Sequence, residues 1–258
     1  MKKITNFIKT IITYTLWSFI ALVCALMCVP LACLPAKIRY DNRLYFFCTT
    51  LVSRMVLAAS FIRIKIVGRD NLSIYPEKYP EKYPKNPSII ISNHASALDI
   101  PLLEIIAQTY PHVWMSKAEY LKVPVFGFLL KRMHVTVDRT HETSAGRAFV
   151  KAYQLVKDHK RHLLLFPEGT RHTDGKIHEF NNGFALLAKK LDRPVIPIVI
   201  TSGAQVFSAK SFLIDSSAGH ITMSIGKPMI CMPDESVEDF ARRVHDFFKE
   251  ELKRLQKN

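Results

Sequence analysis

A long uncharged apolar segment near the N-terminus constrains this chain more than any other feature. It runs from Thr10 to Ala36 and contains no charged residue. A membrane-spanning helix needs ~20 consecutive apolar residues, so this segment is long enough to cross a bilayer. The apolar core of a cleaved signal peptide is shorter, at about 7–15 residues. A lipoprotein signal ending at Cys33 would carry an aliphatic residue where Pro30 stands. We therefore predict a retained membrane anchor.

The residues around this segment leave its path through the membrane open. Three basic residues flank it on each side: Lys2, Lys3 and Lys9 before it, and Lys37, Arg39 and Arg43 after it. This symmetry does not decide orientation by the positive-inside rule. Pro30 and Pro35 are expected to kink or end the helix, so the segment fits either a crossing of both leaflets or an entry into one leaflet.

A second apolar run, from Leu44 to Ile62, is interrupted by Arg54. It fits an interfacial or partly buried helix whose arginine reaches towards lipid phosphates, and it equally fits an ordinary core helix. Four of the five cysteines lie in this N-terminal region without metal-ligand spacing. We expect no disulfides, which suits a catalytic domain in a reducing cytoplasm.

The charge of the chain predicts an anionic partner. Lys and Arg total 36 against 22 Asp and Glu, which gives a net charge of +14. Such a chain associates with nucleic acid, phosphorylated small molecules or acidic lipid headgroups. The sequence has neither a groove-reading helix nor an aromatic stacking motif, so nucleic acid is not an expected partner.

From Ser88 onward, short apolar runs alternate with helical patterns. The runs expected to form strands are 88–92, 112–116, 134–137, 162–166, 195–200 and 220–226. Helices are expected near 98–108, 142–160 and 183–191, and helical pieces over 118–131. A final helix has apolar positions at helical spacing from Val237 to Leu252, with Ser236 and Asp239 at capping-box spacing. This alternation is typical of βαβ units, so we predict an α/β domain with a largely parallel sheet flanked by helices.

We predict two regions, a membrane-anchoring helical region over residues 1–60 and a catalytic domain over residues 61–258. Phe61–Val67 alternates apolar and basic residues, which is the pattern of a half-buried strand. Tyr75–Pro87 repeats a Tyr-Pro unit whose prolines exclude helix and central strand. We interpret residues 74–87 as an exposed loop insertion, for which a tolerated surface insertion is the simplest explanation.

The segment after the first central strand carries the first candidate chemistry. In α/β folds, sites lie in the loops at the carboxyl ends of strands. Here Asn93-His94-Ala95-Ser96-Ala97-Leu98-Asp99 separates His94 and Asp99 by four residues in a strand-to-helix turn. The carboxylate could hold the imidazole in the tautomer that takes a proton from a hydroxyl. Alternatively, Ser96 or Asp99 simply caps a helix that has Pro101 in its first turn.

Two further strand ends carry unusual polar residues. Phe166-Pro167-Glu168-Gly169-Thr170-Arg171 offers a glycine for close backbone approach and a guanidinium for phosphate. It is also compatible with a Pro-Gly turn beside a solvated arginine. Val137-Asp138-Arg139 ends another strand, and Arg139 fits either a second clamp on the same anion or a surface pair with Asp138.

In their order and spacing, NHASALD, VDR and FPEGTR resemble the glycerolipid acyltransferase family, specifically 1-acylglycerol-3-phosphate acyltransferases. Three more stretches are similar to family elements: Lys117–Gly127, Phe180–Gly183 and Ile196–Ile198. The resemblance covers Ser88 to Ile200. Met133 and Thr136 stand where the family usually has glycine and an aromatic residue, so another lysophospholipid or a lyso-aminolipid is an alternative acceptor. The Tyr-Pro repeat is outside the family pattern.

The resemblance implies a single glycerolipid-acyltransferase-like domain and roles for individual residues. It implies that His94 is a general base oriented by Asp99, and that the acceptor headgroup lies near Arg139 and Arg171. The other residues implied to bind substrate are Asn93, Ser96, Lys117, Glu168, Gly169 and Thr170. A positioned base typically contributes about 10²–10⁴-fold to a rate, which suits a hydroxyl nucleophile.

The resemblance also implies the substrates and the location. The acyl donor would be acyl-CoA or acyl carrier protein, and the partners are membrane lipids and a lysophospholipid acceptor. We expect no metal or nucleotide cofactor, since the sequence has no phosphate-binding glycine loop or ligand-spaced histidine cluster. The expected location is a bacterial inner membrane with the catalytic domain facing the cytoplasm. A non-catalytic lipid-binding protein is the alternative from a different class.

Overall fold

The computed structural model describes residues 2–72, 87–108, 110–138, 142–158, 161–201, 203–207 and 220–257. The predicted Tyr-Pro loop lies outside these ranges, apart from Pro87. The strands are β1 (Arg63–Val67), β2 (Ile89–Ser92), β3 (His112–Lys117), β4 (Val135–Val137), β5 (His162–Leu165), β6 (Val195–Thr201) and β7 (His220–Ile225). The α-helices are α1 (Lys2–Cys33), α2 (Ala36–Arg39), α3 (Arg43–Ala59), α4 (Asp99–Ala107), α5 (Phe126–Met133), α6 (Glu142–Asp158), α7 (Gly183–Leu191), α8 (Gly203–Val206) and α9 (Val237–Lys257), with 3₁₀ turns η1 (Arg69–Leu72) and η2 (Ala118–Lys122).

Within the described residues, seven strands form one sheet in the order β1-β7-β6-β2-β5-β3-β4. Neighbouring strands are parallel except β6 and β7, which pair antiparallel. The predicted α/β fold with a largely parallel sheet is therefore confirmed. The carboxyl ends of β2, β3, β5 and β6 meet at one edge of the sheet, where the loops that carry the candidate residues begin.

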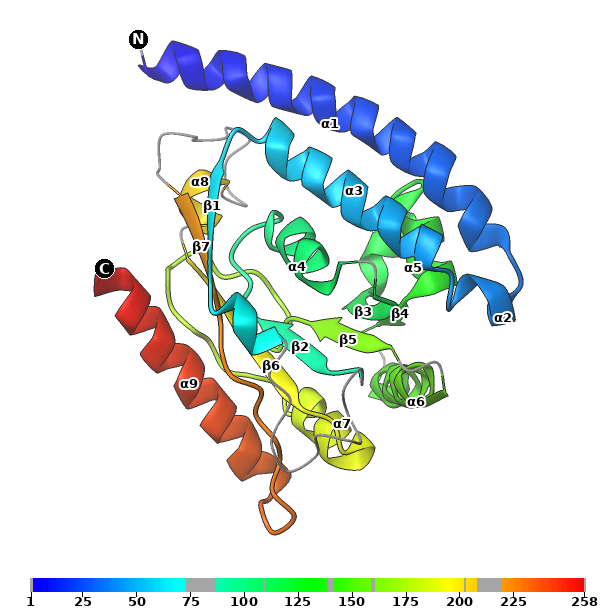
Figure 1. Cartoon of the computed structure of the whole chain (residues 1–258), viewed down its shortest axis with the longest axis vertical. Coiled ribbons are helices and arrows are strands. Elements are labelled where there is room, and N and C mark those ends of the chain that lie inside the picture. Colours follow the sequence, from blue (N-terminus) through cyan, green and yellow to red (C-terminus); the bar gives the residue numbers. More distant parts are fainter. Residues whose placement is uncertain are drawn as a thin grey trace.

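The central strands are buried on both faces, which explains their uninterrupted apolar sequences. Along β2, Ile89 and Ile91 contact the core that α6, α7 and α9 form on one face. Ile90 lies between them in sequence and points to the opposite core, which α4 covers with help from Leu57 of α3. Figure 1 shows these two helical layers on either side of the sheet.

Helix α9 begins where the sequence predicts. The Asp239 backbone N–H donates to the Ser236 hydroxyl at 3.0 Å, and this hydroxyl donates to the Asp239 carboxylate at 2.7 Å. On the apolar stripe of the helix, Phe240, Val244 and Phe248 are fully buried, and Val237 and Phe247 are partly buried. The helix continues past Leu252, the last apolar position of the predicted stripe, and ends at Lys257.

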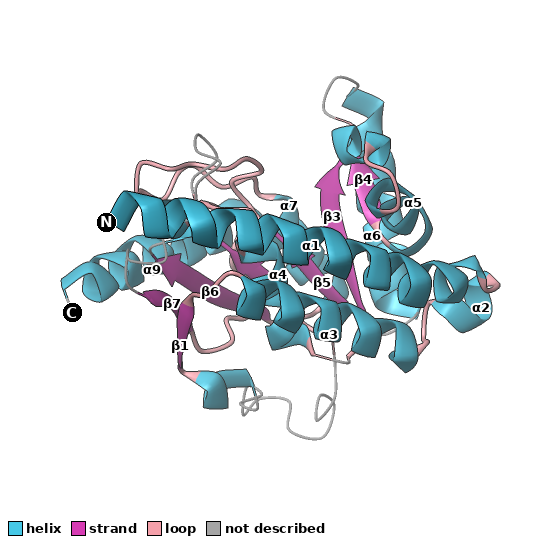
Figure 2. Cartoon of the chain, turned by 90° about the horizontal axis from the view of Figure 1, so that it is seen from above, coloured by secondary structure: helices cyan, strands magenta, loops and turns pink. Residues whose placement is uncertain are grey.

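The N-terminal helices form a layer over α4 (Figures 1 and 2). Helix α1 continues through Pro30 and ends at Cys33, just before Pro35. Its inner face bonds to the end of α3, where the Thr13 hydroxyl donates to the Ala59 carbonyl at 2.8 Å and the Trp17 indole donates to the Val56 carbonyl at 3.2 Å. Helix α3 is partly buried, and Arg54 is exposed.

The end of α1 is fastened to α5 by Arg132. Its guanidinium donates to the carbonyls of Ala32 and Cys33, the last residues of α1, and of Leu34, which follows them, at 3.0 to 3.3 Å. Unpaired carbonyls at a helix C-terminus carry partial negative charge, so a cation is favoured there. Helices α1 and α5 are thereby joined at this end.

The outer face of α1 is an exposed apolar surface. The segment Thr5–Cys33 is long and apolar enough to cross a membrane, with a mean hydropathy of 2.4 and only 17% of its most apolar window buried. The exposed large side chains on this helix are Phe7, Ile8, Ile11, Ile12, Leu16, Phe19, Leu22 and Leu26. Apolar surface of this extent is typical of contact with lipid or protein, and a helix this long and apolar indicates membrane association.

Candidate active site

His94 and Asp99 form a hydrogen-bonded pair in the turn between β2 and α4. The Nδ1 atom of His94 lies 2.9 Å from Oδ2 of Asp99, whose side chain is fully buried, whereas 11% of the His94 side chain is exposed. The same carboxylate oxygen accepts the backbone N–H groups of Ala95 and Ser96 at 2.7 and 2.8 Å. Because a carboxylate can only accept, it favours the tautomer with hydrogen on Nδ1 and a free Nε2.

Glu168 connects the His94 turn to the loop that follows β5. Its Oε1 accepts the backbone N–H of His94 at 3.0 Å, and its Oε2 accepts the backbone N–H of His178 at 3.1 Å. Burial raises the pKa of this carboxyl to about 7. The next residue, Gly169, has φ of +71°, a conformation that side chains rarely adopt. Glu168 thus holds two segments of the site together through their backbones.

Phe166 supports the imidazole from below. The rings of His94 and Phe166 are stacked, with centroids 3.8 Å apart and an interplanar angle of 7°. Trp114 in turn contacts Phe166, with centroids 5.8 Å apart. Phe166 begins the FPEGTR segment, but nothing in the sequence predicts its stacking on His94. This packing fixes the orientation of His94 in addition to its bond with Asp99.

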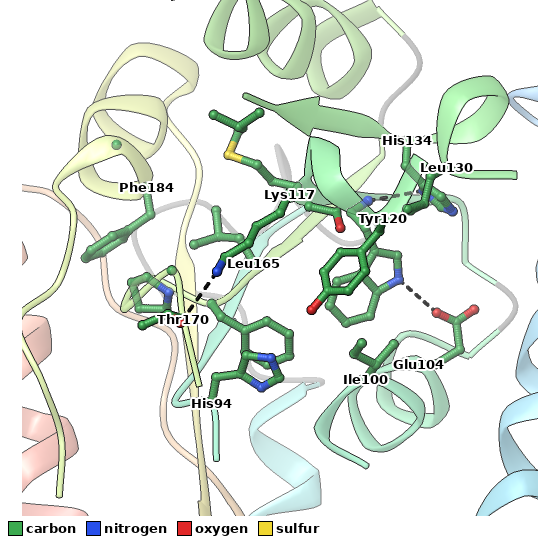
Figure 3. Close-up of a pocket in the computed structure, with 18 of the residues that line it drawn as sticks. His94, Ile100, Glu104, Lys117, Tyr120, Leu130, His134, Leu165, Thr170 and Phe184 are labelled. Carbon is green, nitrogen blue, oxygen red and sulfur yellow. Dashed lines mark hydrogen bonds between the residues drawn. The ribbon is translucent and has the colours of Figure 1, made fainter. Parts of the chain in front are cut away.

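A mostly apolar cavity of about 780 Å³ opens beside His94 (Figure 3). Its walls come from α3, β3, α5, α6 and the ends of β5 and α7. The apolar lining residues include Val52, Ile100, Leu129, Leu130, Phe149, Leu165, Phe184 and Leu187. Cys24 of α1 also lines it. A cavity of this size and character suits a long hydrocarbon chain.

Cationic and hydroxyl groups gather on one side of this cavity. The Lys117 ammonium lies 3.5 Å from the Thr170 hydroxyl, and the Arg171 guanidinium donates to the Tyr120 hydroxyl at 3.3 Å. All four side chains line the cavity, and Figure 3 shows the Lys117 ammonium reaching Thr170 close to His94, with Tyr120 to the right of them. Two positive charges beside an apolar space can bind a ligand that has an anionic group and a hydrocarbon tail.

Farther inside the cavity, Glu104 organises a buried polar group. Burial alone would raise the pKa of Glu104, but His112 lies 3.0 Å from the carboxylate and holds the pKa at about 2. The Trp114 indole donates to the same oxygen at 3.0 Å. This network joins α4 to β3 and was not predicted, because nothing in the sequence pairs residues 104, 112 and 114.

Two predicted substrate-binding residues have side chains that bond within the protein. The Asn93 amide exchanges hydrogen bonds with the backbone of Ile200 at 2.9 and 2.8 Å and so ties β2 to β6. The buried Ser96 hydroxyl donates to the Phe207 carbonyl at 2.9 Å and accepts the Leu98 N–H at 3.3 Å. The structure thus brings together His94, Asp99, Lys117, Glu168, Gly169, Thr170 and Arg171. Arg139 lies outside the described residues.

The first backbone N–H groups of α4 have hydrogen-bond partners within the turn. The N–H groups of Asp99 and Ile100 donate to the carbonyls of Ser96 and Ala97 at 3.3 and 3.4 Å. They are therefore already hydrogen-bonded within the turn.

Across the described ranges, no group of three or more His, Cys, Asp or Glu side chains is arranged to hold a metal ion.

Comparison with known proteins gives a consistent family. A family model described as Acyltransferase matches residues 63–201. The 1-acyl-sn-glycerol-3-phosphate acyltransferase of Limnanthes alba is 28% identical over 177 residues, which cover 67% of this chain and 62% of that protein. The enzyme of the same name from Saccharomyces cerevisiae is 29% identical over 74% of this chain and 60% of its own length, and that from Borreliella burgdorferi is 31% identical over 61% and 59%. The matched region thus spans about three fifths of these relatives.

A solved structure is similar over the whole chain. The crystal structure of the 1-acyl-sn-glycerophosphate (LPA) acyltransferase PlsC from Thermotoga maritima superposes with a TM-score of 0.78. The match covers 100% of this chain and 99% of that one at 23% sequence identity. This likeness establishes the fold, including the layer of N-terminal helices.

Proposed function

Because the chain belongs to the acyltransferase family, we propose that it transfers an acyl group from acyl-CoA or acyl carrier protein to the free sn-2 hydroxyl of 1-acylglycerol-3-phosphate. The product would be phosphatidic acid, a precursor of phospholipids. The observation that carries this proposal is the His94–Asp99 pair at the side of a large apolar cavity. The names of the similar proteins from plants, yeast and bacteria support the same acceptor.

The geometry supports general-base catalysis by His94. Asp99 accepts the Nδ1 hydrogen, so Nε2 can take the proton of the acceptor hydroxyl. The hydroxyl oxygen then bonds to the thioester carbonyl carbon, and a tetrahedral intermediate forms. When this intermediate collapses, the carbon–sulfur bond breaks and the imidazolium returns the proton to the departing thiolate. No metal or covalent acyl-enzyme is required in this sequence of steps.

The cationic side of the cavity supports a phosphate-bearing acceptor. We assign the acceptor phosphate to Lys117, Thr170 and Arg171, with Arg139 as a further cation from the sequence motif. Charge-assisted hydrogen bonds to phosphate are roughly twice as strong as neutral ones, so these contacts would favour a lysophosphatidic acid over an uncharged glycerolipid. Glu168 and Gly169 shape this region through the backbone, and the apolar cavity accommodates hydrocarbon.

The membrane location follows from the N-terminal helices. We assign the anchor to a bacterial inner membrane and the catalytic part to its cytoplasmic side, where acyl-CoA and acyl carrier protein are found. The apolar outer face of α1 supports attachment to the bilayer, which also holds the lipid acceptor. Protease digestion of inverted and right-side-out vesicles would test the orientation.

Transfer of a labelled acyl group to 1-acylglycerol-3-phosphate by the detergent-solubilised protein tests the proposal. We expect product from the wild type, and at least a 10²-fold lower rate from His94→Ala with an unchanged melting temperature. A panel of other lysophospholipids and a lyso-aminolipid competes in parallel. Full activity of His94→Ala would contradict the mechanism, and equal use of acceptors without a phosphate would contradict the assigned acceptor.

A further inference from the structure

A second pocket, of about 770 Å³, lies on the other side of His94. Among the described residues, His94 is the one residue that lines both this pocket and the apolar cavity. The walls of the second pocket come from the end of β6, α8, the first residues of β7, β1, the loop after Arg171 and the last turn of α9. The two spaces therefore share His94 as a wall residue.

The second pocket differs from the apolar cavity in chemical character. Thr201, Gln205 and Thr222 contribute hydroxyl and amide groups to its lining. The cationic side chains at its walls are Lys65, Lys176 and Arg254, and the carboxyl groups there are those of Glu168, which bonds to the backbone, and Asp174. The apolar cavity instead has many leucine, isoleucine, valine and phenylalanine side chains in its lining. The pocket thus suits a hydrophilic, anionic ligand.

Two of the three cations are available to a ligand. Arg254 pairs with Glu251, and the nearby Asp174 pairs with His178. Lys65 and Lys176 are exposed, and no ion pair of their ammonium groups occurs within the described part of the chain. An unpaired ammonium at the wall of a pocket is a typical binding group for phosphate.

A thioester acyl donor has one apolar part and one hydrophilic part, which match the apolar cavity and the second pocket. Its hydrocarbon chain and its long hydrophilic arm join at the thioester, which is the reacting group and must lie beside His94. The arm of both acyl-CoA and acyl carrier protein is a phosphopantetheine, which carries amides and a phosphate. The acceptor has no comparable arm, because its phosphate is separated from the free hydroxyl by only a short glycerol link.

We propose that the second pocket binds the phosphopantetheine arm of the acyl donor, with Lys65 and Lys176 contacting its phosphate. This inference rests on the proposed function and extends it to the donor site. The acyl chain of the donor then lies in the apolar cavity, and the thioester carbonyl lies between the two spaces at Nε2 of His94. The amides of the arm face the hydroxyl and amide groups of Thr201, Gln205 and Thr222.

The test uses the full-length, detergent-solubilised chain and three variants. Lys65→Glu with Lys176→Glu reverses the charge at the pocket. Lys190→Glu with Lys249→Glu makes the same change of charge at two exposed lysines on α7 and α9 that do not line the pocket. Gln205→Trp narrows the pocket without changing charge. Melting temperatures establish that each variant folds.

Steady-state rates are measured with acyl-CoA, with acyl carrier protein and with the acceptor as the varied substrate. We expect the pocket variant to raise the donor KM by about tenfold or more, as loss of charge-assisted bonds to phosphate would, while the acceptor KM stays within about twofold of the wild type. Gln205→Trp should also raise the donor KM. The α7 and α9 control pair should resemble the wild type. A rise with both donors identifies the pantetheine phosphate, and a rise with acyl-CoA alone identifies the phosphates of its nucleotide.

Direct binding separates this inference from the proposed reaction. Calorimetric titration with free coenzyme A measures binding without any transfer, and we expect weaker binding by the pocket variant alone. An unchanged donor KM, or a rise in the acceptor KM instead, would overturn the assignment of the pocket. Absence of transfer by the wild type with every donor and acceptor would instead reject the proposed function, even if coenzyme A still bound at Lys65 and Lys176.

Discussion

At the scale of single residues, Asp99 is fully buried and accepts three hydrogen bonds with one carboxylate oxygen. Its Oδ2 accepts hydrogen bonds from His94 and from the N–H groups of Ala95 and Ser96. In Asp99→Asn, an amide must replace a charged acceptor, and the preferred His94 tautomer loses its partner. We expect kcat to fall by about 10²–10⁴-fold with little change in either KM. Initial rates over a range of pH measure this, and a rate near that of the wild type would contradict the orienting role.

Glu168 should make stability depend on pH. Burial raises its pKa to about 7 from an ordinary value of 4.5, so folding favours the protonated carboxyl. Its contribution to the free energy of unfolding is complete below pH 4.5 and is lost as pH rises through 7. At 1.36 kcal/mol per pH unit, the loss approaches about 3 kcal/mol.

The matched variant is Glu168→Gln, which cannot ionise. Melting temperatures of the wild type and the variant are compared between pH 4.5 and pH 8. Relative to the variant, the wild type should become less stable as the pH rises. Parallel curves for the two proteins would show that Glu168 does not titrate in this range.

The sequence predicts which residues form the candidate site, but it does not predict how they hold one another. The motif segments predicted His94, Asp99 and Glu168, and their positions at the ends of β2 and β5 followed from the alternation of strands and helices. The bond from Glu168 to the His94 backbone spans 74 residues, and the stacking of Phe166 depends on two neighbouring strands. Such contacts arise from the sheet order, which local patterns do not encode.

At the scale of elements, α1 presents one face to the protein and an apolar face outward. Replacing Phe19 and Leu26 on the outer face by aspartate should weaken binding to lipid vesicles, because full burial of each large apolar side chain contributes roughly 1.5–3 kcal/mol. More than a tenfold loss is therefore expected in a vesicle flotation assay. The Lys190→Glu and Lys249→Glu variant serves as a control for charge. Unchanged flotation would mean that this face does not contact the bilayer.

Most elements were predictable because their periodicities are strong. The seven strands expected from the sequence are all present, and the major helices lie within a few residues of their predicted ranges. The antiparallel pairing of β6 with β7 was not predicted, since a buried apolar strand has the same sequence pattern in either direction. The second apolar run was left open, and α3 combines a buried face with exposed Phe47 and Leu51.

At the scale of the whole molecule, we expect the net charge of +14 to strengthen binding to an anionic bilayer beyond the apolar contact of α1. Basic residues near an anionic bilayer contribute about 1 kcal/mol each, and this attraction is screened by salt. The protein should bind anionic vesicles at least tenfold more tightly than neutral ones at about 0.1 M salt. The difference should largely disappear at about 1 M salt, where the Debye length is about 3 Å. Equal binding to both vesicles at low salt would contradict an electrostatic contribution.

The division of the chain at residue 60 stays a prediction. In the structure, helices on the N-terminal side of residue 60 help to line the cavity beside His94. Cys24 of α1 and four side chains of α3, Tyr45, Thr49, Val52 and Ser53, line the same cavity as His94. The apolar composition of these helices predicts an anchor. It does not predict that their inner faces line a cavity, because this depends on how they pack against α4 and α5.

The shared wall has a consequence for how such a protein can change. A helix that only attached the chain to a membrane could be replaced by another apolar helix. Helices α1 and α3 also line the cavity, so replacing them would change its shape. Substitutions selected for a different lipid environment would also reshape the space for a hydrocarbon chain. Substitutions that shift α1 or α3 are therefore expected to change the cavity beside His94 as well.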